Sequence, residues 1–495
     1  MLKSVNTIRN QSLHFQYNGK ADGFALQKEV SDWCRFTLIP EIEEKLEPFA
    51  LADNYITIDK LVIDATVDKK DWQQKLRNEL ISSLNRKLSS FKPVYKKPET
   101  GQKNEPLFYK LDELILFYFE KGYLPWWSKA VIDDNFDTIL FNWITEDKSQ
   151  SRASHIIFKL QQISSRPVIQ RILNQVPDRI FFTFLKNIFK KEAEIIRKAE
   201  SFFNEILKAV NKGIKEKAIS GAVYEVTLAT LIKNNGKLDI GITLKAFHIA
   251  IQNKIGIAAS ALKALPGKAS LSANPFEKTW QKLLTEEIQN NVDKNMEAIR
   301  KENKLKYRRV IDQLNNKSLD KKNKEQVAED LQEGIYIENA GAVIVAAFLP
   351  VLFERLKITA KAEIIKPSLG ALMIQYIVSG KTKAEEHELL LPKILCGISP
   401  ELPVNTNKRI SATQKNEADE MLRSVIEHWT TIKNTSVDGL RESFLQRSGK
   451  LILLEDEWLL QVEQKSFDML LQQLPWNISM IKLPWMKNLL KTEWV

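Results

Sequence analysis

The chain has 495 residues, of which 44% are hydrophobic and 27% are charged, with 17 glycines and 17 prolines. This composition excludes a collagen-like, low-complexity or fully disordered chain, and the length suits two or three domains. The two cysteines, Cys34 and Cys396, exclude a disulfide scaffold and a multi-cysteine zinc site, and they favour a reducing compartment. The formal net charge is +11 at pH 7, and most of the excess lies in residues 201–330.

No stretch of the chain predicts a membrane-spanning helix or a secretory signal. The N-terminus lacks a continuous apolar segment, and the longest apolar run, Ala340 to Phe353, is shorter than the roughly 20 residues that a spanning helix needs. We therefore expect this run to be a buried core helix, and we expect no membrane segment and a cytoplasmic chain.

The first 91 residues predict a small α+β domain. Alternating apolar residues at 6–18 and 56–65 are typical of short strands. Between them, the apolar positions of residues 22–51 follow helical spacing. Residues 92–106 contain three prolines and a glycine without an apolar period, which indicates a linker.

Residues 107–190 predict a helical domain that carries a Pro-Trp-Trp element at 125–127. Residues 191–335 predict a basic helical middle, whose most basic stretch is 300–309. Acidic residues are interleaved with these lysines and arginines, which favours a solvated helix face over a nucleic-acid surface. The pattern of the middle suits a coiled coil or an ordinary helical bundle equally well.

Residues 336–495 predict a compact all-α domain, so the expected fold class is mainly α-helical. The predicted helices lie at 339–356, 368–379, 385–391, 415–432 and 457–473. Five tryptophans fall in the last 80 residues: Trp429, Trp458, Trp476, Trp485 and Trp494.

No constellation of residues predicts catalysis, a cofactor or a metal. The segment 379–382, Ser-Gly-Lys-Thr, ends like a phosphate-binding loop, but such a loop needs a glycine where Gln375 stands. His387 begins a His-Glu pair without the second histidine that a zinc helix places at the position of Leu391. We therefore interpret Gly380 as a helix stop, the two cysteines as core residues and the protein as a non-enzyme.

Many motifs with rare tryptophan and proline positions resemble, in order, those of contractile injection system tape measure proteins, which accompany phage-tail-like extracellular injection particles. These motifs are SDWC at 31–34, LPWW at 124–127, IENAG at 337–341, FLP at 348–350, HEL at 387–389, PKILCG at 392–397, EHW at 427–429, GLRE at 439–442, FLQR at 444–447, and LPW at 474–476 and 483–485. The resemblance covers roughly residues 6–150 and 336–495.

The resemblance implies a structural assembly protein that sets tube and sheath length and helps to initiate tube assembly, with residues 191–335 as the candidate ruler segment. The implied partners are the inner tube protein, the baseplate hub or spike and the tube-terminating cap, with several copies of the chain inside the tube. Assembly would be cytoplasmic, and the protein would then lie in the tube lumen of a particle that is released from the cell. An assembly chaperone or adaptor that folds compactly and measures nothing is the alternative. The candidate contact residues are Trp126, Trp127, Trp476, Trp485 and Trp494, because aromatic side chains dominate interface energetics.

Overall fold

The computed structural model describes residues 23–50, 71–89, 105–125, 127–128, 136–210, 217–255, 275–290, 331–332, 334–455 and 457–495. The predicted strands at 6–18 and 56–65, the linker and the basic stretch 300–309 lie outside these residues. The chain divides into two compact units, one of residues 1–115 and 125–136, the other of residues 116–124 and 137–495. The domain boundaries expected from the sequence stay predictions.

The first unit contains the helix expected at 22–51, which is confirmed as α1 (Gly23–Trp33), a π-helical turn (Cys34–Leu38) and α2 (Ile39–Ala50). The π turn precedes Pro40, which has no N–H to donate, and the amide of Ile39 donates to the carbonyl of Cys34 five residues earlier. Helix α3 (Trp72–Ser89) completes the core, where the rings of Trp33 and Trp72 meet edge to face with centroids 5.0 Å apart. Helix α4 (Glu105–Lys121) begins in this unit and ends in the other.

The first part of the second unit is helical. It contains α5 (Phe136–Thr145), α6 (Gln150–Ile163), α7 (Arg166–Gln175), α8 (Phe181–Ile188), α9 (Ala193–Val210), α10 (Lys217–Lys233), α11 (Ile240–Ile255) and α13 (Pro275–Asn290), with 3-10 turns at Asp178–Ile180 and Lys190–Glu192. Ser149 and Ser165 accept hydrogen bonds from the first turns of α6 and α7, so each helix begins at a serine cap.

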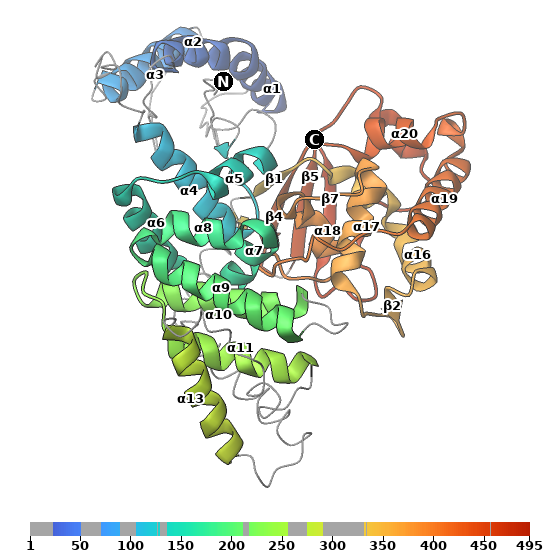
Figure 1. Cartoon of the computed structure of the whole chain (residues 1–495). Coiled ribbons are helices and arrows are strands. Elements are labelled where there is room, and N and C mark those ends of the chain that lie inside the picture. The colour runs from blue at the N-terminus through green and yellow to red at the C-terminus, as the bar shows by residue number, and fades with distance from the viewer. Residues whose placement is uncertain are drawn as a thin grey trace. The chain divides into compact units, whose positions relative to one another are not determined.

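The described part of the predicted basic middle is a packed bundle. Helix α10 packs against α11, and α13 packs against α11 and α9 (Figure 1). The rings of Phe202 and Phe247 both lie against Trp280 of α13, with centroids 5.9 and 5.5 Å away. Apolar faces of these helices are therefore buried against one another.

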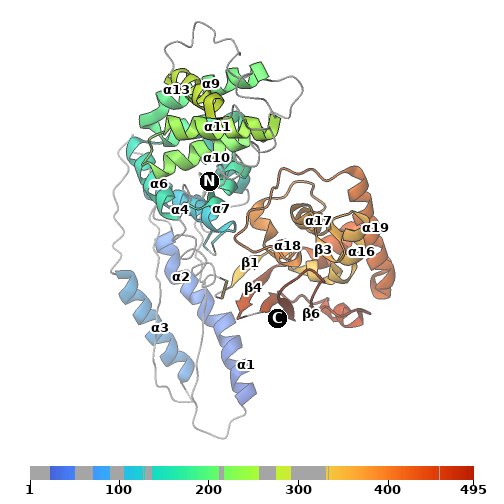
Figure 2. The same ribbon diagram turned by 90° about the horizontal axis from the view of Figure 1, so that it is seen from below.

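The rest of the second unit joins helices to a sheet. Its helices are α16 (Leu349–Arg355), α17 (Pro367–Ser379), α18 (Leu390–Leu395), α19 (Ala412–His428) and α20 (Val437–Leu440). Its 3-10 turns are Ala340–Phe348, Glu386–Leu389, Thr430–Ile432 and Asp468–Gln473, and a π turn follows α20 at Arg441–Leu445. Helices α16 to α19 lie on one side of the sheet (Figure 2). The run from Ala340 is buried and helical as expected, although its first nine residues form the tighter 3-10 helix.

The expectation of an all-α C-terminal domain is wrong, because five strands form a sheet in the order β1-β4-β5-β7-β6. The strands are β1 (Ile335–Ile337), β4 (Gly449–Leu454), β5 (Glu457–Val462), β6 (Met480–Ile481) and β7 (Leu489–Trp494), and β2 (Thr359–Ala360) and β3 (Glu363–Ile364) form a separate pair. In β5, Trp458, Leu460 and Val462 are buried while the residues between them are half-buried. This period of two belongs to a strand and not to the helix that the sequence predicts at 457–473. The chain remains mainly helical.

Candidate functional site

The first two candidate contact tryptophans belong to the first unit. Trp126 lies outside the described residues. Trp127 is half-buried, and the Nζ atom of Lys110 lies 4.1 Å from the centroid of its ring. This cation–π contact leaves part of the Trp127 ring accessible.

Trp476 and Trp485 are anchored within the C-terminal region. The indole N–H of Trp476 donates to the carbonyl of Ile344 at 2.8 Å, and that of Trp485 donates to the carbonyl of Leu395 at 2.8 Å. The Trp485 ring also stacks on Phe353, with centroids 5.5 Å apart and planes 17° from parallel. Both tryptophans are half-buried, so each combines an internal structural role with some exposed surface.

Trp494 lies at the end of β7 beside a buried ion pair. The guanidinium carbon of Arg447 is 5.3 Å from the centroid of the Trp494 ring, and the same guanidinium binds both carboxylate oxygens of Asp468 at 2.9 and 2.5 Å. The side chains of the pair are 0% and 3% exposed. A bidentate pair of this kind fixes the segment after β5 against the residues just before β4.

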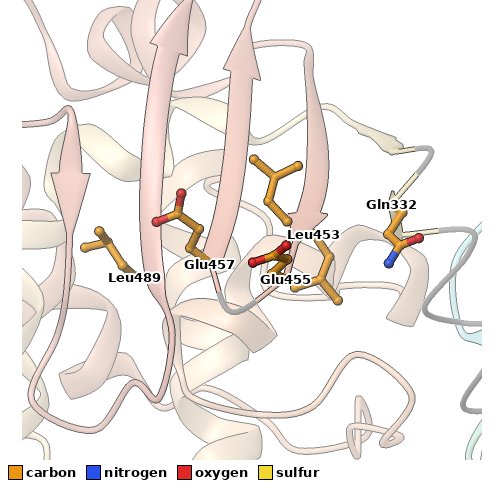
Figure 3. Close-up of a pocket in the computed structure, with 6 residues that line it drawn as sticks. Gln332, Leu453, Glu455, Glu457 and Leu489 are labelled. Atoms are coloured by element: carbon orange, nitrogen blue, oxygen red, sulfur yellow. The ribbon is translucent and has the colours of Figure 1, made fainter.

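A shallow pocket opens at the end of the sheet where β4 turns into β5 (Figure 3). It has a volume of about 570 Å³, and its lining consists of Gln332, Leu453, Leu454, Glu455, Glu457 and Leu489. Glu455 has a left-handed backbone with φ of 37°, which a glutamate rarely adopts. Glu457 pairs with Lys491 at 2.5 Å. This pocket was not predicted from the sequence, because of the three strands that line it β5 is predicted as helix and β4 and β7 are not predicted at all.

A second feature that sequence reasoning missed is a charged interface within the second unit, between residues 118–124 and 137–174 on one side and residues 383–407 on the other. At its centre Arg171 of α7 donates to Glu386 at 3.2 Å, and Lys393 of α18 donates to the same carboxylate oxygen at 2.8 Å. All three side chains are at most 1% exposed. Burial lowers the pKa of Lys393, since a charged ammonium is poorly solvated there.

Lys383 bridges two carboxylates at the edge of the same interface. Its ammonium donates to Asp137 at the start of α5 and lies 3.1 Å from Glu385. Burial and the hydrogen bond with Asp137 raise the pKa of Glu385 to about 8. Burial opposes ionisation of Asp137, but hydrogen bonds with Glu385 and Lys383 hold its pKa below the ordinary value. The two carboxyl groups therefore share a proton near neutral pH.

The residues that had suggested a nucleotide or metal site have structural roles. Gly380 ends α17 with φ of 70°, which confirms its interpretation as a helix stop. His387 is largely buried, and burial lowers its pKa to about 4. Cys34 and Cys396 are buried as expected, and burial raises the pKa of both thiols. Within the described residues, no group of three or more His, Cys, Asp or Glu side chains is placed to hold a metal ion.

None of the helices in the described part of the chain is long and apolar enough to cross a membrane. The sequence model of the contractile injection system tape measure proteins matches residues 5–494. The chain belongs to this family. Neither a curated protein nor a solved structure matches it. Family membership supports a structural role in contractile injection systems, in association with other components of such a particle.

Proposed function

We propose that this tape measure family member sets the length of the tube and sheath of a phage-tail-like particle and helps to initiate tube assembly. The observation that carries the proposal is the family match over residues 5–494. The proposed partners are the inner tube protein, the baseplate hub or spike and the terminating cap, with several copies of the chain in the tube lumen. We propose that the chain acts without catalysis, assembles in the cytoplasm and leaves the cell inside the particle.

The five tryptophans remain our candidates for contacts with these partners. Trp476 and Trp485 each have a hydrogen bond inside the chain, and Trp494 has a cation–π contact. Removing any of the three is therefore expected to act on the fold of the C-terminal region as well as on docking. Trp127, for which the described residues provide a cation–π contact with Lys110, offers the cleaner test of docking alone.

Particle length measured by electron microscopy tests the ruler. A deletion of residues 291–330 leaves α13 and its buried Trp280 in place. If these residues measure length as an α-helix, the deletion shortens the tube by about 60 Å, at 1.5 Å per residue, and a tandem duplication lengthens it by the same amount. A control that permutes the order of the residues in 291–330 should leave the length unchanged.

An assembly chaperone or adaptor is the second candidate, and the packing of α9, α10, α11 and α13 favours it. Helices α9, α11 and α13 share an aromatic core and α10 packs against α11, which suits a protein that acts in a compact form. Under this alternative, the deletion and the duplication both give particles of the normal length. A change of length in both directions would exclude it.

A further inference from the structure

The charged interface of the second unit could separate without leaving Arg171 short of hydrogen-bond partners. Arg171 also donates to the carbonyls of Phe119 at 2.5 Å and Glu120 at 3.0 Å, which lie on its own side, and to that of Glu401 at 2.8 Å across the interface. If the two sides separated, Arg171 would therefore lose only its hydrogen bonds to Glu386 and to the carbonyl of Glu401. Its guanidinium would be free to enter water.

The other side would keep a balanced pair of charges. Lys393 and Glu386 lie on adjacent turns, and Lys393 also donates to the carbonyl of Pro400 at 3.2 Å. Breaking a buried ion pair is costly when an uncompensated charge stays behind. Here the cluster of two cations and one carboxylate would divide into a neutral pair and one solvated cation, so no uncompensated charge would stay buried.

Further polar contacts cross the interface. Asn407 donates to the carbonyl of Asn174 at 3.1 Å, and Lys383 joins Asp137 to Glu385. Apolar contacts accompany them: Tyr123 lies buried in the C-terminal core, Phe117 packs against that core, and the rings of Tyr118 and His387 meet edge to face with centroids 6.3 Å apart. Polar interfaces within a chain are typical of parts that move relative to each other.

We propose that this charged interface opens reversibly as the pH rises through neutrality, and that both of its sides stay folded when it opens. The inference concerns the isolated chain and does not depend on the proposed function.

The direction of the pH dependence follows from the Asp137–Glu385 pair. In the closed form the pKa of Glu385 is about 8, while an exposed glutamate has an ordinary value of 4.5. The closed form therefore binds one more proton than the open form, and its advantage is complete below pH 4.5 and lost as the pH rises through 8. One proton changes the ratio of open to closed molecules by up to tenfold per pH unit.

Other ionisable groups face the same site from α4, α7 and the segment around Glu385. They are Tyr118, Arg171, Lys381, Lys383, Glu386, His387 and Glu388. His387, with a pKa of about 4 when buried and an ordinary value of 6.5, would favour opening only below pH 6.5. Measurements between pH 6.5 and 7.5 therefore exclude an effect of His387 protonation, and a Glu385→Gln variant isolates the contribution of Glu385.

Distance measurements between two spin labels test the proposal on the full chain. Ser154 of α6 and Asn416 of α19 are exposed and lie on opposite sides of the interface, while both native cysteines are buried, so Ser154→Cys and Asn416→Cys provide selective labelling sites. We expect a second, longer distance whose population grows up to tenfold between pH 6.5 and 7.5. In Glu385→Gln, which mimics the protonated carboxyl, the population should stay low at both pH values.

An Arg171→Met variant tests the centre of the interface and should raise the open population already at pH 6.5. The matched control is Arg152→Met, because Arg152 is also buried but pairs at 2.9 Å with Glu146 on its own side. Unchanged circular dichroism in Arg171→Met would show that both sides stay folded. A single distance at every pH in the wild-type and Arg171→Met proteins would overturn the proposal, as would an equal pH response in wild type and Glu385→Gln.

Discussion

Trp485 stacks on Phe353 while its indole N–H reaches back to the carbonyl of Leu395, so one side chain joins the loop before β7 to both α16 and α18. Trp485→Ala removes the stack and the hydrogen bond together, and we expect it to lower the free energy of unfolding by about 3 kcal/mol. Trp485→Phe keeps a ring against Phe353 and should cost about 1 kcal/mol, the value of a lost hydrogen bond. Denaturant unfolding measures both. Equal losses in the two variants would contradict the role of the stack.

Gly341 lies where the 3-10 run meets the π turn at Arg441–Leu445. A Cβ atom there would lie 1.8 Å from the carbonyl oxygen of Phe444 and 2.6 Å from the Cα of Leu445. Since backbone cannot yield as a side chain does, Gly341→Ala should destabilise the protein by about 3 kcal/mol. Gly221→Ala in α10 is the control, because no described atom lies within 4 Å of its added methyl group, and it should stabilise by about 0.5–1 kcal/mol. The melting temperatures should move in opposite directions.

His248 predicts acid sensitivity of the helical bundle. It is 2% exposed, neither ring nitrogen has a hydrogen-bond partner among the residues that the structure describes, and burial lowers its pKa to about 4 from the ordinary 6.5. Between pH 6.5 and 4, His248 is therefore protonated in the unfolded chain but neutral in the folded chain. The free energy of unfolding falls by up to about 3 kcal/mol as the pH drops through this range. His248→Phe should lose this part of the pH dependence in urea unfolding between pH 7 and 4.5. Parallel profiles for wild type and variant would refute the assignment.

Arg447 and Asp468 form a buried ion pair, so the effect of substituting one residue on the free energy of unfolding should depend on whether the other is present. Arg447→Met leaves the Asp468 carboxylate buried without its cation, and we expect a loss of about 3–5 kcal/mol. The double variant Arg447→Met, Asp468→Asn removes the stranded charge and should recover about 2 kcal/mol of that loss. Additive losses in a double-mutant cycle would show that the two residues act independently.

Elements whose structure follows from local sequence pattern could be predicted. Helical spacing and proline and glycine positions correctly gave the helix at 22–51, the buried run from Ala340 and the end of α17 at Gly380. The prediction failed at β5, where half-buried Leu459 stands between buried Trp458 and Leu460 and conceals the alternation. Three adjacent apolar residues fit a helix as well as a strand, and what decides is pairing with β4 and β7.

The charged interface could not have been predicted for a related reason. Arg171 lies 215 positions from Glu386 in the chain, and neither residue belongs to a motif. Only the fold brings them together. The family, in contrast, could be inferred from the order of the tryptophan and proline motifs, and the match over residues 5–494 confirms it.

Because β7 follows β5 in the chain, the β4–β5 hairpin is synthesised before the strand that covers its edge. Strands β5 and β7 pair in parallel, and β7 then separates β5 from β6. While the ribosome is still making residues 463–488, the β4–β5 hairpin has one edge without its neighbour, and Leu460 and Val462 lack part of their burial. Open strand edges with apolar residues invite pairing with other chains. Translation speed over this stretch, and chaperones that shield nascent chains, are therefore expected to govern the yield of correctly folded protein.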